Sequence, residues 1–75
     1  MSKHIRTIQV GPYKVTKSEE DGRTHIFVRM IGYSASAAAV ENGSPLTDDK
    51  FNEHEIRAHQ LPGVLKAIEE LDDEQ

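Results

Sequence analysis

Two cations and a phenylalanine fall on one face of a hairpin that the sequence predicts around Asp21-Gly22. If these two residues form the loop, Lys14 lies opposite Arg29, with Phe27 on the same face. Like charges directly opposite each other destabilise an antiparallel pair unless an anion lies between them. An exposed Phe27, with Tyr33 further along, would add rings on which bases stack, at about 1–3 kcal/mol each. These residues predict a surface for single-stranded nucleic acid.

The same register sorts the remaining hairpin side chains into two faces. A slip by one residue would mix the two sets, so the sorting itself supports the register. The apolar face pairs Val15 with Val28, Lys17 with Ile26, and Tyr13 with Met30, and the polar face adds Thr16 with Phe27 and Ser18 with His25. The sequence leaves open whether Phe27 is exposed or is covered by residues 34–52 or by a second subunit.

The four histidines do not form a recognisable metal-binding pattern. His54 and His59 have neither the spacing of ligands on a helix nor that of alternate positions on a strand. The sequence has no cysteine, no Gly-x-Ser-x-Gly motif and neither glycine-rich nucleotide-binding fingerprint. A domain of this size also has little room for a pocket. We therefore predict a protein that is not an enzyme and that uses no metal or cofactor.

Composition indicates a small domain with an uneven charge. The chain has 75 residues and a net charge of −4, and it has no cysteine to form a disulfide. Such a domain buries only about 60% of the surface that its unfolded chain exposes, so we expect a homodimer to supplement the core. Residues 1–29 hold six Lys or Arg against three Asp or Glu, whereas residues 30–75 hold three against ten. This asymmetry suggests a basic surface for an anionic partner beside an acidic half.

Neither a membrane span nor a secretory signal is visible in the sequence. No apolar run approaches the roughly 20 residues that cross a bilayer, and residues 1–4 lack the apolar segment of a signal peptide. Together with the absence of cysteine, these features favour a soluble protein in the cytoplasm, with no membrane partner.

The hydrophobic pattern predicts an α+β fold in one domain over residues 1–75, with a small antiparallel sheet of three to four strands and one C-terminal amphipathic helix. Short β-branched or alternating segments indicate strands near residues 5–10, 12–18, 24–33 and 53–58. In the last of these strands, Ile56 and Ala58 are expected to face inward.

The helix is predicted from about residue 61 to 72. Pro62 suits its first turn, and one apolar stripe contains Leu61, Val64, Leu65, Ile68 and Leu71. Residues 34–52 fit either a short helix with a Ser cap and a Gly stop or a long loop of small residues. Residues 72–75 are expected to form a disordered acidic tail.

These elements resemble the positive cofactor four family of single-stranded-DNA-binding transcriptional coactivators, which has small bacterial and phage members. The resemblance is carried by Phe27-Val28-Arg29, by the junction at residues 55–62 and by the helix at residues 64–71. It implies a homodimer joined through the helices, whose curved sheets bind unpaired strands and act in transcription regulation. By position it implies strand-borne contacts from Lys14, Lys17, Phe27 and Arg29, with Lys50 and Arg57 as weaker members. With Tyr33 added as a stacking ring, the predicted nucleic-acid-binding set is Lys14, Lys17, Phe27, Arg29, Tyr33 and Arg57.

A second hypothesis comes from the acidic half of the chain. A small acidic phage-type factor that inhibits a host enzyme, either by direct binding or as a nucleic-acid mimic, would use its carboxylates and not its cations. Charge reversal at Glu53, Glu55, Glu69 or Asp72 would then abolish activity. Lys14 and Arg29 could be changed freely in that case.

Overall fold

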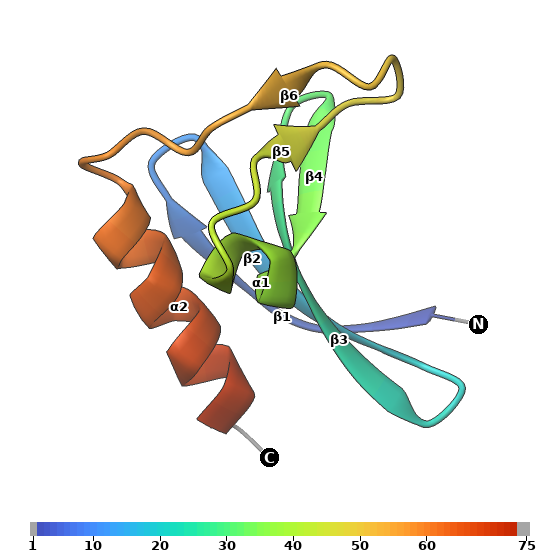
Figure 1. The fold of residues 1–75 in the computed structure, drawn as a ribbon. Helices are drawn as coiled ribbons and strands as arrows, with labels where there is room; N and C mark the ends of the chain where they lie inside the picture. Colours follow the sequence, from blue (N-terminus) through green and yellow to red (C-terminus); the bar gives the residue numbers. More distant parts are fainter. Residues whose placement is uncertain (1, 74–75) are drawn as a thin grey trace.

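The computed structural model describes residues 2–73 as an antiparallel sheet with helices on one face (Figure 1). The strands lie side by side in chain order, each antiparallel to its neighbour. The elements are β1 (Ser2–Val10), β2 (Tyr13–Glu20), β3 (Arg23–Met30), β4 (Tyr33–Ser36), α1 (Ala37–Glu41), β5 (Leu46–Thr47), β6 (Glu53–His54) and α2 (Leu61–Asp73). The predicted α+β fold with a C-terminal helix is confirmed, but the sheet has six strands and not three to four.

The β2–β3 hairpin has the predicted register, with Lys14 paired to Arg29. Asp21 and Gly22 form the two-residue loop and have φ angles of 54° and 79°. Both central residues of a type I′ turn need a positive φ, which Asp tolerates and Gly adopts freely. The local chemistry of this loop therefore fixes the pairing on which the two faces depend.

The predicted strand at residues 24–33 is confirmed to Met30 but is wrong in its last three residues. β3 ends at Met30, and β4 returns beside it after a turn at Ile31-Gly32. Gly32 has a φ of 80°, a conformation that residues with a Cβ rarely adopt. Tyr33 pairs with Met30 and so shares its face of the sheet.

Residues 34–52 contain β4's end, α1 and β5. The Oγ of Ser36 accepts a hydrogen bond from the N–H of Ala39 at 3.2 Å, which caps the start of α1. Gly43 follows the helix with a φ of 83°. Of the two alternatives that the sequence leaves open, the short capped helix is correct.

The predicted strand at residues 53–58 is reduced to β6. The N–H groups of Gln60 and Leu61 both donate to the carbonyl of Arg57, at 2.9 and 3.1 Å, and this turn leads directly into α2. Ile56 is half-buried, as expected, whereas Ala58 is exposed and not inward-facing. The chain leaves the sheet earlier than its alternating pattern predicts.

α2 covers the first three strands. The predicted apolar stripe is confirmed except at Leu65, which is exposed. Val64, Ala67, Ile68 and Leu71 are buried in a core whose other buried apolar members are Tyr13, Val15, Val28, Val40 and Leu46. Gly63 lies where α2 approaches β1, since a Cβ there would be 2.9 Å from Val10 Cγ1. The acidic tail predicted at residues 72–75 is wrong for Asp72 and Asp73, which belong to α2, and residues 74–75 lie outside the described residues.

Candidate nucleic-acid interface

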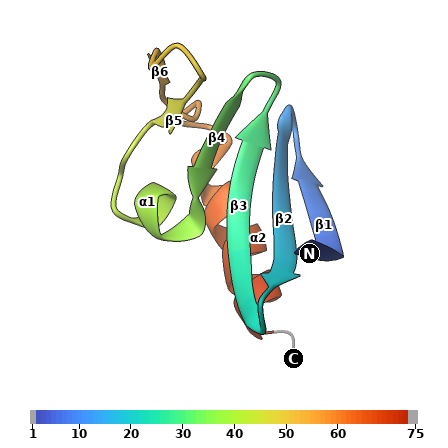
Figure 2. The same cartoon turned by 90° about the vertical axis from the view of Figure 1, so that its right-hand side faces the viewer.

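Figure 2 shows the face of the sheet that is turned away from α2, which we call the outer face. Its side chains are mostly polar. The antiparallel registers place alternate residues of each strand on it, so neighbouring strands contribute rows of side chains. It contains His4, Thr7, Gln9, Lys14, Thr16, Ser18, Glu20, Arg23, His25, Phe27, Arg29, Ser34, Ser36, Thr47 and Glu53. These residues include six hydroxyl groups and only one large apolar side chain, Phe27.

Lys14 and Arg29 lie opposite each other on the outer face, and both are exposed. Within residues 2–73, neither forms an ion pair with a carboxylate. The guanidinium carbon of Arg29 lies 5.8 Å from the centroid of the Phe27 ring. Two neighbouring cations without a counter-charge produce a positive potential that attracts an anion such as a phosphate.

Phe27 is half-buried between two residues of its own strand. The ring centroids of His25 and Phe27 are 6.0 Å apart with an interplanar angle of 31°, and Arg29 lies on the other side. Thr16 of β2 and Ser36 of β4 are its cross-strand neighbours. Residues 34–52 therefore do not bury Phe27 completely, and part of the ring stays accessible.

Polar side chains of β1 extend the outer face beyond the residues that the sequence predicts. The Oγ1 atoms of Thr7 and Thr16 are 3.1 Å apart, and the Nε2 of His4 is 2.7 Å from the Oγ1 of Thr7. The register of β1 shifts between His4 and Arg6, at a bulge. Sequence patterns missed this group because the register of β1 on β2 could not be derived without locating the bulge.

Lys17 does not lie on the outer face, so its place in the predicted nucleic-acid-binding set is corrected. Its side chain is only 7% exposed, and its ammonium donates a hydrogen bond of 2.8 Å to the carbonyl of Leu71, near the end of α2. The alternation of β2 puts Lys17 on the same face as Val15. Its positive charge stabilises the C-terminal end of α2, where main-chain carbonyls lack intrahelical donors and the helix dipole is negative.

Tyr33 and Arg57 also lie apart from Lys14 and Arg29. The turn before β4 places Tyr33 against the core, and its ring centroid lies 3.8 Å from that of His54. Arg57 is in the segment between β6 and α2, where its N–H donates to the hydroxyl of the buried Tyr13 at 3.1 Å. Of the six predicted residues, the structure brings together Lys14, Phe27 and Arg29.

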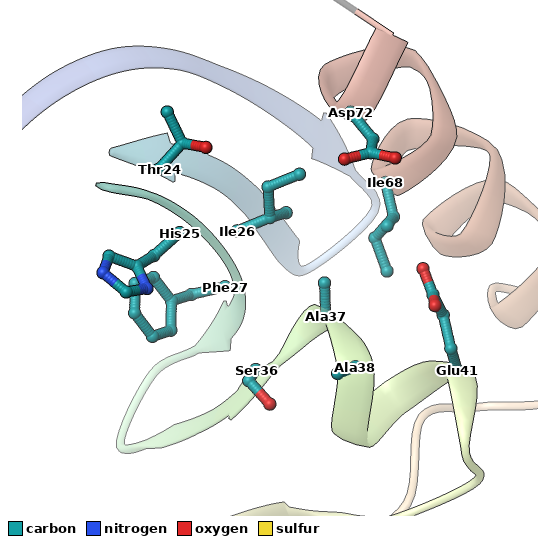
Figure 3. Close-up of a pocket in the computed structure, with 10 residues that line it drawn as sticks. All are labelled: Thr24, His25, Ile26, Phe27, Ser36, Ala37, Ala38, Glu41, Ile68 and Asp72. Atoms are coloured by element: carbon teal, nitrogen blue, oxygen red, sulfur yellow. The ribbon is translucent and has the colours of Figure 1, made fainter. Parts of the chain in front are cut away.

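A groove of about 350 Å³ borders this set at the edge of β3 (Figure 3). β4 pairs with β3 only from Phe27 to Met30, so residues 23–26 have β2 as their only neighbouring strand. Figure 3 shows the rings of His25 and Phe27 on the strand side and the carboxylates of Glu41 and Asp72 on the helical side. These carboxylates give the groove a different charge from the outer face.

The histidines lie in separate environments. His4 is on β1, His25 is beside Phe27, and His54 makes a tilted ring contact with Tyr33. In the described part of the chain, no three His, Asp or Glu side chains are close enough together to hold a metal ion. No helix between residues 2 and 73 is both long and apolar enough to cross a membrane.

Comparisons with protein-family models, with curated proteins and with solved structures find no match to this chain. The resemblance to the positive cofactor four family therefore stays a prediction.

Proposed function

We propose that this protein is a non-enzymatic module that binds single-stranded nucleic acid on the outer face. The observation that carries the proposal is the unneutralised pair Lys14 and Arg29 beside the accessible ring of Phe27. A phosphate placed between the two cations would relieve their repulsion. A base next to that phosphate could stack on Phe27.

Single strands fit this arrangement better than a duplex. Bases of an unpaired strand are free to turn toward an aromatic ring on a sheet, whereas the bases of a duplex are already stacked on each other. The threonine and serine hydroxyls around Phe27 can donate to phosphate or sugar oxygens without demanding a particular sequence. We therefore propose broad specificity for single-stranded DNA or RNA.

The proposal is tested by titrating fluorescently labelled single-stranded and duplex DNA of equal length at two salt concentrations. Tighter binding of the single strand, which weakens as salt rises, supports it. Equal binding of both forms would contradict the stated preference, and no binding at low salt would refute the function. The acidic-inhibitor hypothesis predicts this last result.

We further propose that the protein acts as a homodimer, because a thin core and two short helices give little stability alone. In sedimentation equilibrium we expect a dimer at micromolar concentration, together with a melting temperature that rises with protein concentration. The outward side of α2 has Leu65 among the charged residues Lys66, Glu69 and Glu70, so a contact between helices would be strongly salt-dependent. A monomer whose melting temperature is high and independent of concentration would contradict the dimer.

A further inference from the structure

The loop between β5 and β6 is held in one conformation by Asp48. Its carboxylate accepts hydrogen bonds from the main-chain N–H groups of Lys50 and Asn52, both at 2.9 Å, and from the side-chain amide of Asn52 at 3.2 Å. The N–H of Phe51 donates to the carbonyl of Asp48 at 3.0 Å. These bonds, the one from the N–H of Asn52 above all, lower the pKa of Asp48 below its ordinary value.

Phe51 has the wrong side chain for its place in this loop. Its φ is 64°, in the left-handed region that Gly and Asn adopt readily and that bulky residues avoid. Its side chain is 85% exposed, so contacts with the rest of the described chain do not offset the strain. A residue with a strained backbone and no packing contact to offset the strain indicates that its side chain has a functional role, such as contact with another molecule.

A second exposed apolar residue lies at the same end of the molecule. Ile31, in the β3–β4 turn, is 95% exposed. Figures 1 and 2 both place this turn and the β5–β6 loop at one end, away from the C-terminus of α2. At the base of the β5–β6 loop, the ring of His54 contacts the ring of Tyr33 at an interplanar angle of 56°. Two apolar side chains are thus presented from rigid turns.

The charges near Phe51 identify the kind of partner. Among its neighbours in the chain from residue 49 to residue 55, Asp49, Glu53 and Glu55 are exposed carboxylates, and Lys50 is the one Lys or Arg. Carboxylates repel the phosphates of a nucleic acid but complement a surface that contains Lys or Arg. The surroundings of Phe51 therefore differ in sign from the outer face.

We propose that Phe51 is the anchor of a protein-binding surface, which inserts its ring into an apolar pocket whose rim is basic, with Ile31 as a secondary contact. Aromatic residues that fill a pocket on the partner carry much of the binding energy of protein interfaces. A loop already fixed in its bound conformation loses little entropy on binding. This surface is independent of the proposed nucleic-acid-binding face.

The proposal is tested with a photo-crosslinking benzophenone amino acid at position 51 of the full chain, in an extract of the cells that make the protein. The same amino acid at position 5 is the matched control, because Ile5 is a partly exposed apolar residue elsewhere in the sheet. A protein captured from position 51 and not from position 5 is then identified and purified. Its Kd is measured by calorimetry for the wild type, Phe51→Gly and Ile5→Ser.

The expected result is that Phe51→Gly weakens this Kd by about 30-fold or more, as for a hot-spot residue, while Ile5→Ser leaves it unchanged. Phe51→Gly should also melt at a temperature no lower than that of the wild type, because glycine removes the strain. The proposal is overturned if position 51 captures nothing beyond the control, or if the purified protein binds Phe51→Gly as tightly as the wild type. It is also overturned if Phe51→Gly weakens binding of an oligothymidylate probe, which would assign the loop to nucleic acid.

Discussion

Lys17→Glu is expected to lower the free energy of unfolding by about 3–5 kcal/mol, out of the 5–15 kcal/mol typical of a stable domain. The ammonium of Lys17 is buried and donates to the carbonyl of Leu71, one of the last four carbonyls of α2. A carboxylate at this position would place an acceptor against an acceptor at the negative end of the helix dipole. It would also add a negative charge close to the last turn of α2, which contains Asp72 and Asp73.

Urea unfolding followed by circular dichroism measures this change. Lys14→Glu is the matched control, since it makes the same charge change on the same strand at an exposed position. It should not lower the stability, because it replaces a like-charge pair with Arg29 by an opposite-charge pair. Lys17→Met keeps the apolar stem but removes the donor, and should cost about 1–3 kcal/mol. If Lys17→Glu were no more harmful than Lys14→Glu, the ammonium would not support α2.

Phe27→Ala is expected to weaken binding of an oligothymidylate by about 1–3 kcal/mol, or roughly 5- to 150-fold in Kd. The loss should leave the salt dependence nearly unchanged, because stacking releases few counterions. Fluorescence titration at several salt concentrations measures both quantities. Phe27→Tyr, which keeps a ring at this position, should bind nearly as well as the wild type.

The only other phenylalanine supplies a control for this prediction. Phe51→Ala removes a ring of the same size from a loop that is surrounded by carboxylates, and it should leave oligothymidylate binding unchanged. If both alanine variants lost binding equally, the effect would not be specific to the outer face. If neither did, Phe27 would not be a stacking residue.

The β2–β3 hairpin and α2 could be predicted because local chemistry specifies each of them. Asp21-Gly22 selects a type I′ turn, and the alternation on both sides then determines which residues share a face. The turn at Ile31-Gly32 was missed because β-branched Ile31 continues the strand pattern up to the glycine. β5 and β6 are only two residues long, so they are too short to show an alternating pattern. They form only by pairing with strands that are distant in the sequence, and the local sequence does not predict such pairing.

The candidate site could be predicted only where alternation and charge agree. Lys14, Phe27 and Arg29 lie on the outer face, as the predicted β2–β3 register requires. Lys17 was included for its charge, although the same register placed it on the apolar face, where a lysine can bury its stem and direct its ammonium to a helix end. The strain at Phe51 depends on hydrogen bonds to Asp48 that form only in the folded loop.

The claim that the outer face binds single-stranded nucleic acid is tested most directly by the salt dependence of oligothymidylate binding in a Lys14→Ala/Arg29→Ala double variant. Each neutralised phosphate adds about 0.7 to the slope of log K against log salt for a single strand, and Lys14 and Arg29 are proposed to share one phosphate. Removing both cations should therefore make the slope shallower by about 0.7. Lys66→Ala, which removes an exposed cation from the outward side of α2, should keep the wild-type slope. A double variant whose affinity and slope equal those of the wild type would contradict the proposed function.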